Sequence, residues 1–197
     1  MTPLSRSVQR NLLIALMLAM TATRFHHVGD WLHLPDASMA VFFVGGLTLR
    51  RYAFFALLLG LSVSIDWAAV SLAGVGDFCI TAAYAALPLA YGVLWYAGRA
   101  YQAQLRPRAG SLCLAWGLGV AAAAVSFLIS NGAFYWLGGR YADPHWAQYL
   151  QRAAQWGPLF VRTTALYLAV ALVGAWRPLR WRAVRSAADP ATPLELS

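Results

Sequence analysis

The chain has 197 residues, of which 60% are apolar and 11% are charged, and its formal net charge is +8. A soluble domain carries about 25% charged residues, so this composition excludes an ordinary water-soluble globular protein and also a disordered chain. Two cysteines are too few for a disulfide scaffold. The basic residues are scattered between apolar runs, which is not the pattern of a nucleic-acid-binding face.

Six apolar runs, separated by short polar segments, predict an all-α, polytopic membrane protein with six transmembrane helices. In chain order the predicted spans cover residues 11–25, 38–49, 53–72, 78–98, 110–137 and 156–176. Six spans of about 20 residues use about 120 residues, which leaves no room for a separate soluble catalytic domain. We therefore expect a single six-helix domain over residues 1–185, followed by a disordered cytoplasmic tail, 186–197.

The arginines between the spans predict the orientation of the bundle. Eleven of the fifteen arginines lie in segments on the side of the N-terminus, three lie in the opposite loops, and Arg162 lies within the last span. Because positive residues accumulate in cytoplasmic loops, both termini are expected in the cytoplasm of a protein of the inner membrane. A cleaved signal peptide is the alternative for the N-terminus, where Arg6 and Arg10 precede a short apolar stretch.

Polar and reactive side chains lie at a similar depth on four of the predicted spans. Asp66, Asn131 and Arg162 each lie about six residues from the outer end of a span, or about 9 Å at about 1.5 Å per residue. Cys79 and Tyr84 open the fourth span. Ionisable groups within spans mark candidate functional sites, so we predict a pocket that opens outward. The alternatives are a packing pair of Asp66 with Arg162, an interhelical hydrogen bond from Asn131 and an unreactive, buried Cys79.

The first outer loop, Arg24 to Asp36, contains three of the four histidines of the chain, His26, His27 and His33. One interpretation is a lid that closes over the pocket and lends His27 or His26 to a ligand. Another is an interfacial loop anchored by Trp31. A zinc site is a third alternative, although the spacing of the histidines matches no standard zinc pattern.

Aromatic side chains are frequent near the predicted outer face, and Trp67 and Tyr135 are among them. They form either the usual aromatic belt of a membrane protein or the walls of a site for a large planar ligand. The alanines that follow Cys79 are also open to two interpretations. They permit close helix packing, or they leave room for a bulky ring system beside the thiol.

Two segments resemble a known family. Ser64–Trp67 and Gly74–Tyr84, together with the pair His26-His27, are similar to the substrate-binding S-components of energy-coupling-factor vitamin transporters. They look most like the solitary, cobalamin-specific S-components of Gram-negative bacteria. The resemblance covers all six spans as topology, but its specific motifs cover only about twenty-five residues. It implies an S-component-like bundle that binds cobalamin from the outside for uptake and is not an enzyme.

In that family, the residues equivalent to His27, Asp66, Cys79 and Tyr84 surround the corrinoid, with the cysteine at cobalt. The resemblance therefore implies that Cys79 is an axial ligand of the cobalt of cobalamin, and a soft thiolate is competent for that role. The thiolate would displace the benzimidazole base, with cyanide release from cyanocobalamin as a side chemistry. His27 is the rival cobalt ligand.

The expected ligand-binding residues are His27, Asp66, Trp67, Tyr84, Asn131, Tyr135 and Arg162. Among them, Asp66, Tyr84 and Asn131 would bond the corrin amides, and Arg162 would face the phosphate. No cofactor is expected besides cobalamin as bound substrate.

Ala15 and Ala19 form an Ala-xxx-Ala motif on the first span. S-components commonly use such a motif to dock the shared transmembrane coupling subunit, which works with ATPases. Besides the lipid bilayer, that subunit is the expected protein partner, and no nucleic acid is expected. Two alternative functions stay open: an S-component for riboflavin or thiamin, and a small thiol-dependent membrane enzyme with Cys79 as nucleophile and His27 as base.

Overall fold

The computed structural model describes residues 6–25, 34–49, 51–74 and 80–188, and within these ranges the chain is entirely helical, without a β-strand. The predicted all-α class is therefore confirmed for the described residues. The elements are α1 (Arg6–Arg24), α3 (Ser38–Thr48), α4 (Tyr52–Ala73), the 3₁₀-helix η2 (Ala82–Ala86), α5 (Leu87–Tyr101), α6 (Ala109–Leu137) and α7 (Trp146–Ala188).

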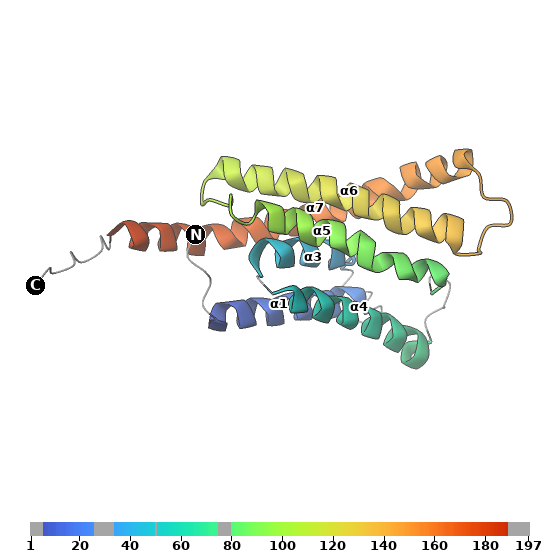
Figure 1. Ribbon diagram of the computed structural model, residues 1–197, viewed down its shortest axis with the longest axis horizontal. Coiled ribbons are helices and arrows are strands. Elements are labelled where there is room, and N and C mark those ends of the chain that lie inside the picture. Colours follow the sequence, from blue (N-terminus) through green and yellow to red (C-terminus); the bar gives the residue numbers. More distant parts are fainter. Residues whose placement is uncertain (1–5, 26–33, 50, 75–79, 189–197) are drawn as a thin grey trace, which may run out of the picture.

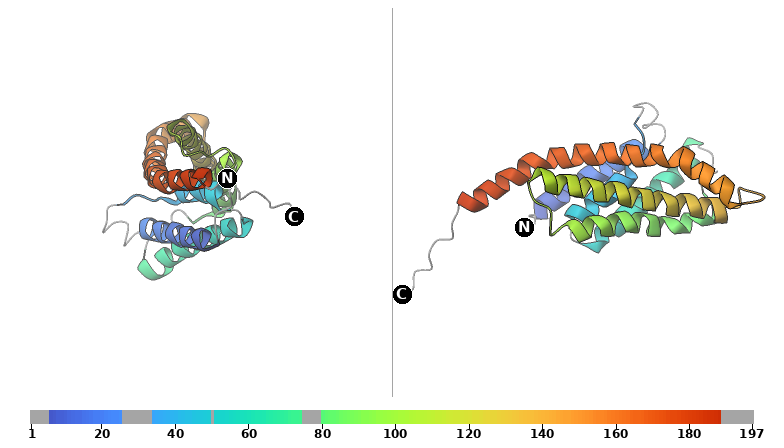
Figure 2. Two further views of the ribbon diagram at one scale, coloured as in Figure 1. Left: turned by 90° about the vertical axis from the view of Figure 1, so that its left-hand side faces the viewer. Right: turned by 90° about the horizontal axis from the view of Figure 1, so that it is seen from above.

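The helices lie along the long axis of the molecule and alternate in direction, as Figure 1 shows. α3 and α5 pack against each other in the middle of the bundle, with α6 and α7 on one side and α1 and α4 on the other (Figures 1 and 2). We call the end of the bundle at which α1 and α6 finish the Arg24 end. The opposite end, at which α5 finishes, is the Arg99 end.

The middle of the bundle depends on α3, the most enclosed helix. Phe42 of α3 stacks on Tyr91 of α5 with ring centroids 4.1 Å apart. Glycines let the two backbones approach closely, because a Cβ atom on Gly98 of α5 would lie only 2.2 Å from the carbonyl oxygen of Phe43. The 11 residues of α3 span about 16 Å, so α3 is a short central helix surrounded by longer ones.

Three helices are long and apolar enough to cross a membrane: Tyr52–Leu72, Ala109–Leu137 and Trp146–Gly174. They expose large apolar side chains on their outer surfaces, such as Leu72 of α4 and Val170 of α7. Continuous exposed apolar surface of this kind is typical of contact with lipid. α3 is also apolar but shorter than a typical span. A described helix overlaps each of the six predicted spans, and three of these helices have the length and composition of a membrane span. The fourth span, predicted over 78–98, starts differently in the structure, because Ala82–Ala86 form the 3₁₀-helix η2 and the α-helix begins only at Leu87.

The main difference from the sequence prediction is the start of α7. The helix begins at Trp146, ten residues before the predicted span, because its first three turns are amphipathic rather than apolar. Pro158 lies inside it, and a proline removes one backbone hydrogen bond and bends a helix. Figure 2 shows that α7 curves along its length. It continues to Ala188, three residues into the segment predicted as a tail.

Candidate functional site

A cavity of about 390 Å³ lies at the Arg24 end, between the α1–α4 side and the α6–α7 side of the bundle. Its volume falls within the range of about 300–1,000 Å³ that is usual for small-molecule sites. Its polar lining residues are Arg24, Asp66, Tyr84, Ser130, Asn131 and Arg152, and the rest of its wall is apolar and aromatic. Of the predicted ligand-binding residues, the structure thus brings Asp66, Tyr84 and Asn131 to one cavity.

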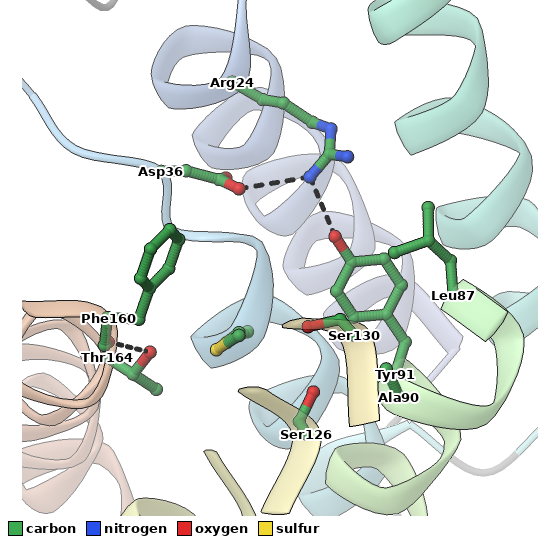
Figure 3. Close-up of a pocket in the computed structure, with 10 residues that line it drawn as sticks. Arg24, Asp36, Leu87, Ala90, Tyr91, Ser126, Ser130, Phe160 and Thr164 are labelled. Atoms are coloured by element: carbon green, nitrogen blue, oxygen red, sulfur yellow. Dashed lines mark hydrogen bonds and ion pairs between the residues drawn. The ribbon is translucent and has the colours of Figure 1, made fainter. Parts of the chain in front are cut away.

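A second cavity of about 200 Å³ adjoins the first and shares Arg24 and Ser130 with it. It extends further towards the Arg99 end, where Ser126 and Thr164 line it (Figure 3). The Ser126 hydroxyl oxygen is buried without a hydrogen-bond partner, while Thr164 donates its hydroxyl to the carbonyl of Phe160 at 3.0 Å. The polar lining therefore continues inward from the larger cavity.

Arg24, the last residue of α1, is the centre of an ion network between the two cavities. Its Nε and Nη2 atoms donate to Asp66 Oδ1 and Oδ2 at 2.7 and 2.6 Å, which is the bidentate geometry of a strong arginine–carboxylate pair. Its Nη1 atom donates to Asp36 Oδ2 at 3.1 Å and to the Tyr91 hydroxyl at 2.8 Å (Figure 3). The Tyr84 hydroxyl donates to Asp66 Oδ2. One guanidinium and two carboxylates thus join α1, α4, η2, α5 and the chain before α3.

The partner of Asp66 is Arg24 and not Arg162, the residue that the sequence suggested. Arg162 is exposed on α7 and lines neither of the two cavities. The reason is the early start of α7, which places Arg162 about ten residues, or about 15 Å, nearer to the Arg99 end than Arg152. Arg152 occupies the depth that the sequence assigned to Arg162, and it does line the larger cavity.

Trp67 and Tyr135, which were predicted to bind the ligand, line neither cavity. Trp67 is 63% exposed on α4. Tyr135 is 1% exposed, and its hydroxyl donates to Gln148 Oε1 at 2.7 Å and accepts the backbone N–H of His145 at 2.8 Å. Its ring packs against neighbouring aromatic rings, including that of Tyr149 at 5.6 Å. These contacts indicate that Tyr135 anchors the turn between α6 and α7.

The predictions for His27 and Cys79 fall in segments 26–33 and 75–79, outside the described residues. The two roles stay predictions. In the part of the chain that the structure describes, no three His, Cys, Asp or Glu side chains are grouped so that they could hold a metal ion. Ala15 and Ala19 are both exposed on α1, so a partner could reach this face of the helix.

Arg24 and Arg152 line the larger cavity but are missing from the sequence prediction. Arg152 has its guanidinium carbon 4.9 Å from the centre of the Tyr141 ring, and its buried Nε atom has no hydrogen-bond partner. Asn131 faces the same cavity from α6, and its buried Oδ1 atom also lacks a partner. The sequence feature that could have identified Arg152 is the helical spacing of Trp146, Tyr149 and later apolar residues. This spacing predicts an amphipathic helix that includes Arg152.

No protein-family model matches this sequence, and a search of curated proteins finds no match. The cavity, its ion network and its two unpaired polar groups are therefore the basis on which a function can be assigned.

Proposed function

We propose that the protein is a solute-binding protein of the inner membrane that binds cobalamin from the outside and serves its uptake. The observation that carries the proposal is the cavity of about 390 Å³ at the Arg24 end, where polar side chains from several helices meet within apolar walls. A chain with only 11% charged residues gathers two arginines and an aspartate there, and such groups within a membrane bundle indicate a ligand site.

The orientation of this site follows from the arginines at the two ends. Most of the arginines outside the apolar stretches of the helices lie at the Arg99 end, and Arg6, Arg10 and Arg106 are among them. By the positive-inside rule, that end is cytoplasmic and the Arg24 end opens outward. In the proposal all six spans cross the membrane. α3 is surrounded by its neighbours rather than by lipid, so the hydrocarbon thickness that a lipid-exposed helix must match does not set its length.

Cobalamin is the proposed ligand because both segments with a resemblance to cobalamin-specific S-components contribute to the cavity. Asp66 comes from the first segment and Tyr84 from the second, and the two side chains are hydrogen-bonded to each other. Cys79, five residues before Tyr84, is the proposed axial cobalt ligand, and His27 is its rival. A corrinoid is larger than this cavity, so its binding requires the α1–α4 side and the α6–α7 side to move apart. Docking of a coupling subunit at Ala15 and Ala19 belongs to the same proposal.

The volume of the cavity also favours a second candidate. A smaller vitamin such as riboflavin or thiamin fits about 390 Å³ without a rearrangement of the helices, because this volume is typical of sites for drug-sized ligands.

An absorption spectrum of the purified protein tests the proposal directly. After incubation with cobalamin and gel filtration in detergent, we expect corrinoid absorption to co-elute with the protein. Cys79→Ser should shift the corrinoid bands, because the thiolate would no longer bind cobalt. If only His27→Ala shifts them, histidine is the cobalt ligand. Protein that retains no corrinoid but retains a flavin would replace cobalamin by the second candidate, and a colourless protein with thiol-dependent hydrolase activity would make it an enzyme.

A further inference from the structure

Arg152 is the one charged side chain of the larger cavity that has no counter-charge among the described residues. Arg24 is paired with Asp66 at 2.6 Å and with Asp36 at 3.1 Å, whereas no described carboxylate lies within ion-pair distance of Arg152. We infer that Arg152, together with Asn131, binds the anionic oxygens of a phosphodiester. This subsite deepens the proposed function and rests on it where the phosphodiester belongs to cobalamin.

The contacts of Arg152 leave its hydrogen-bond donors free for a ligand. The guanidinium carbon lies 4.9 Å from the centre of the Tyr141 ring, and a cation–π contact of this kind holds the group without accepting a hydrogen bond from its N–H donors. The Nε atom is buried and has no partner. A guanidinium that is partly removed from water and unpaired is unfavourable, so an anion in the cavity would gain from pairing with it. The edge formed by Nε and one Nη atom matches two oxygens of one phosphate.

Asn131 provides the second contact from α6, on the facing helix. Its side chain lines the same cavity as Arg152, and its Oδ1 atom is buried without a partner. Because no hydrogen bond fixes this oxygen, the amide can rotate and present its NH₂ group to a phosphate oxygen. Arg24 cannot replace Arg152 in this role, since the edge formed by its Nε and Nη2 atoms is already bonded to Asp66, and its Nη1 atom is bonded to Asp36 and Tyr91.

A phosphodiester can reach this subsite from two sources. One is the nucleotide loop of cobalamin, which carries a single phosphodiester. The other is the headgroup of a phospholipid, which carries the same group and is present at the surface of any bilayer. In both sources the phosphodiester is a monoanion with two free oxygens, so Arg152 and Asn131 would bind it by the same contacts. Two pairs of probes distinguish the sources.

The first pair is cobalamin and cobinamide, a corrinoid that lacks the nucleotide loop and its phosphodiester. The assay is equilibrium binding to the full chain in a maltoside detergent, which contains no phosphate. Arg152→Gln should weaken cobalamin binding by about tenfold or more, as expected for a lost charged hydrogen bond, and leave cobinamide binding unchanged. The matched control is Arg162→Gln on the same helix, which removes an exposed arginine that lines neither cavity and should change neither affinity.

The second pair is dihexanoylphosphatidylcholine and dihexanoylglycerol, which differ in the phosphodiester headgroup. The phospholipid should raise the melting temperature of the wild type and of Arg162→Gln, but not that of Arg152→Gln, and the glycerolipid should raise none of them. Arg152→Lys keeps the charge but not the two-donor edge, so its response should be intermediate. Such a response would show that the loss in Arg152→Gln reflects the missing contact and not a folding defect.

Loss of the phosphodiester response in either pair, specific to Arg152→Gln, supports the subsite and identifies its source. The subsite is overturned if neither pair shows such a loss, either because Arg152→Gln and Arg162→Gln behave alike in both pairs or because Arg152→Gln weakens cobalamin and cobinamide equally and leaves the phospholipid response intact. Failure of the proposed function gives a different result from failure of the subsite, because the wild-type protein then binds neither cobalamin nor cobinamide. In that case the lipid pair still tests the role of Arg152.

Discussion

The Arg24 side chain is 12% exposed and the Asp66 side chain is 22% exposed, so the pair is largely removed from water at the place where α1 meets α4. Both oxygens of Asp66 are already bonded, Oδ1 to Arg24 and Oδ2 to Arg24 and Tyr84. A carboxylate with this many internal bonds has little capacity left for a ligand. Its main contribution is therefore expected to be to the position of Arg24.

A double-mutant cycle tests this interpretation. Asp66→Asn leaves a partly buried guanidinium without its bidentate partner and should lower the free energy of unfolding by about 2–4 kcal/mol. Arg24→Gln should have a similar effect for the converse reason. The double variant should lose less than the sum of the two, with a coupling energy of about 1–3 kcal/mol, measured by thermal unfolding in detergent. Strict additivity would mean that the two side chains do not depend on each other.

At the level of single residues, the sequence was sufficient to predict that Asp66, Tyr84 and Asn131 lie close together, but not which arginines line the same cavity. The first three share a depth near the Arg24 end, and depth can be counted along a helix once one end is known. The sequence prediction placed Arg162 in the site instead of Arg152, because the apolar run of α7 begins ten residues after the helix does. An error in one helix boundary therefore changed which arginine faces the cavity.

At the level of elements, α5 has two glycines that provide a matched comparison. Gly98 packs against α3, where a Cβ atom would lie 2.2 Å from the carbonyl oxygen of Phe43. Gly98→Ala should therefore push the two central helices apart and lower the free energy of unfolding by about 1–3 kcal/mol. Gly92 has no atom within 4 Å of such a Cβ, so Gly92→Ala should be neutral or stabilising by up to about 1 kcal/mol, since alanine favours the helix.

Thermal unfolding of the two variants in the same detergent makes the comparison. Equal melting temperatures for Gly98→Ala and Gly92→Ala would show that the close approach of α3 and α5 does not limit stability.

The existence of these helices was predictable from apolar runs, whereas the contact between α3 and α5 was not. It depends on which faces of the two helices carry glycine, and a helix that is apolar on all sides, as α3 is, has no polar face that indicates its orientation.

At the level of the whole molecule, the alternating direction of the helices agrees with the alternation that the sequence predicts, because short connections between long helices leave few other arrangements. The composition of the chain also predicted its apolar surface. The full length of α7 was not predictable, since its polar first turns lie outside the apolar run by which a span is recognised. Its curvature was not predictable either, because Pro158 lies within that run without ending it. These are the features that determine which side chains of α7 face the cavity.

The arginines between the helices also predict which side of the membrane each end of the bundle faces. Truncation fusions to a reporter after Arg108 and after Ser197 should report a cytoplasmic location, because both positions follow arginine-rich segments near the Arg99 end. A fusion after Asp143, between α6 and α7, should report the periplasm. Glu substitutions at Arg106 and Arg108 should weaken this orientation, whereas substitution of Arg140 in the opposite loop should not. A periplasmic signal after Ser197, or equal signals on both sides of α6, would contradict the six-span arrangement and with it an outward-facing cavity.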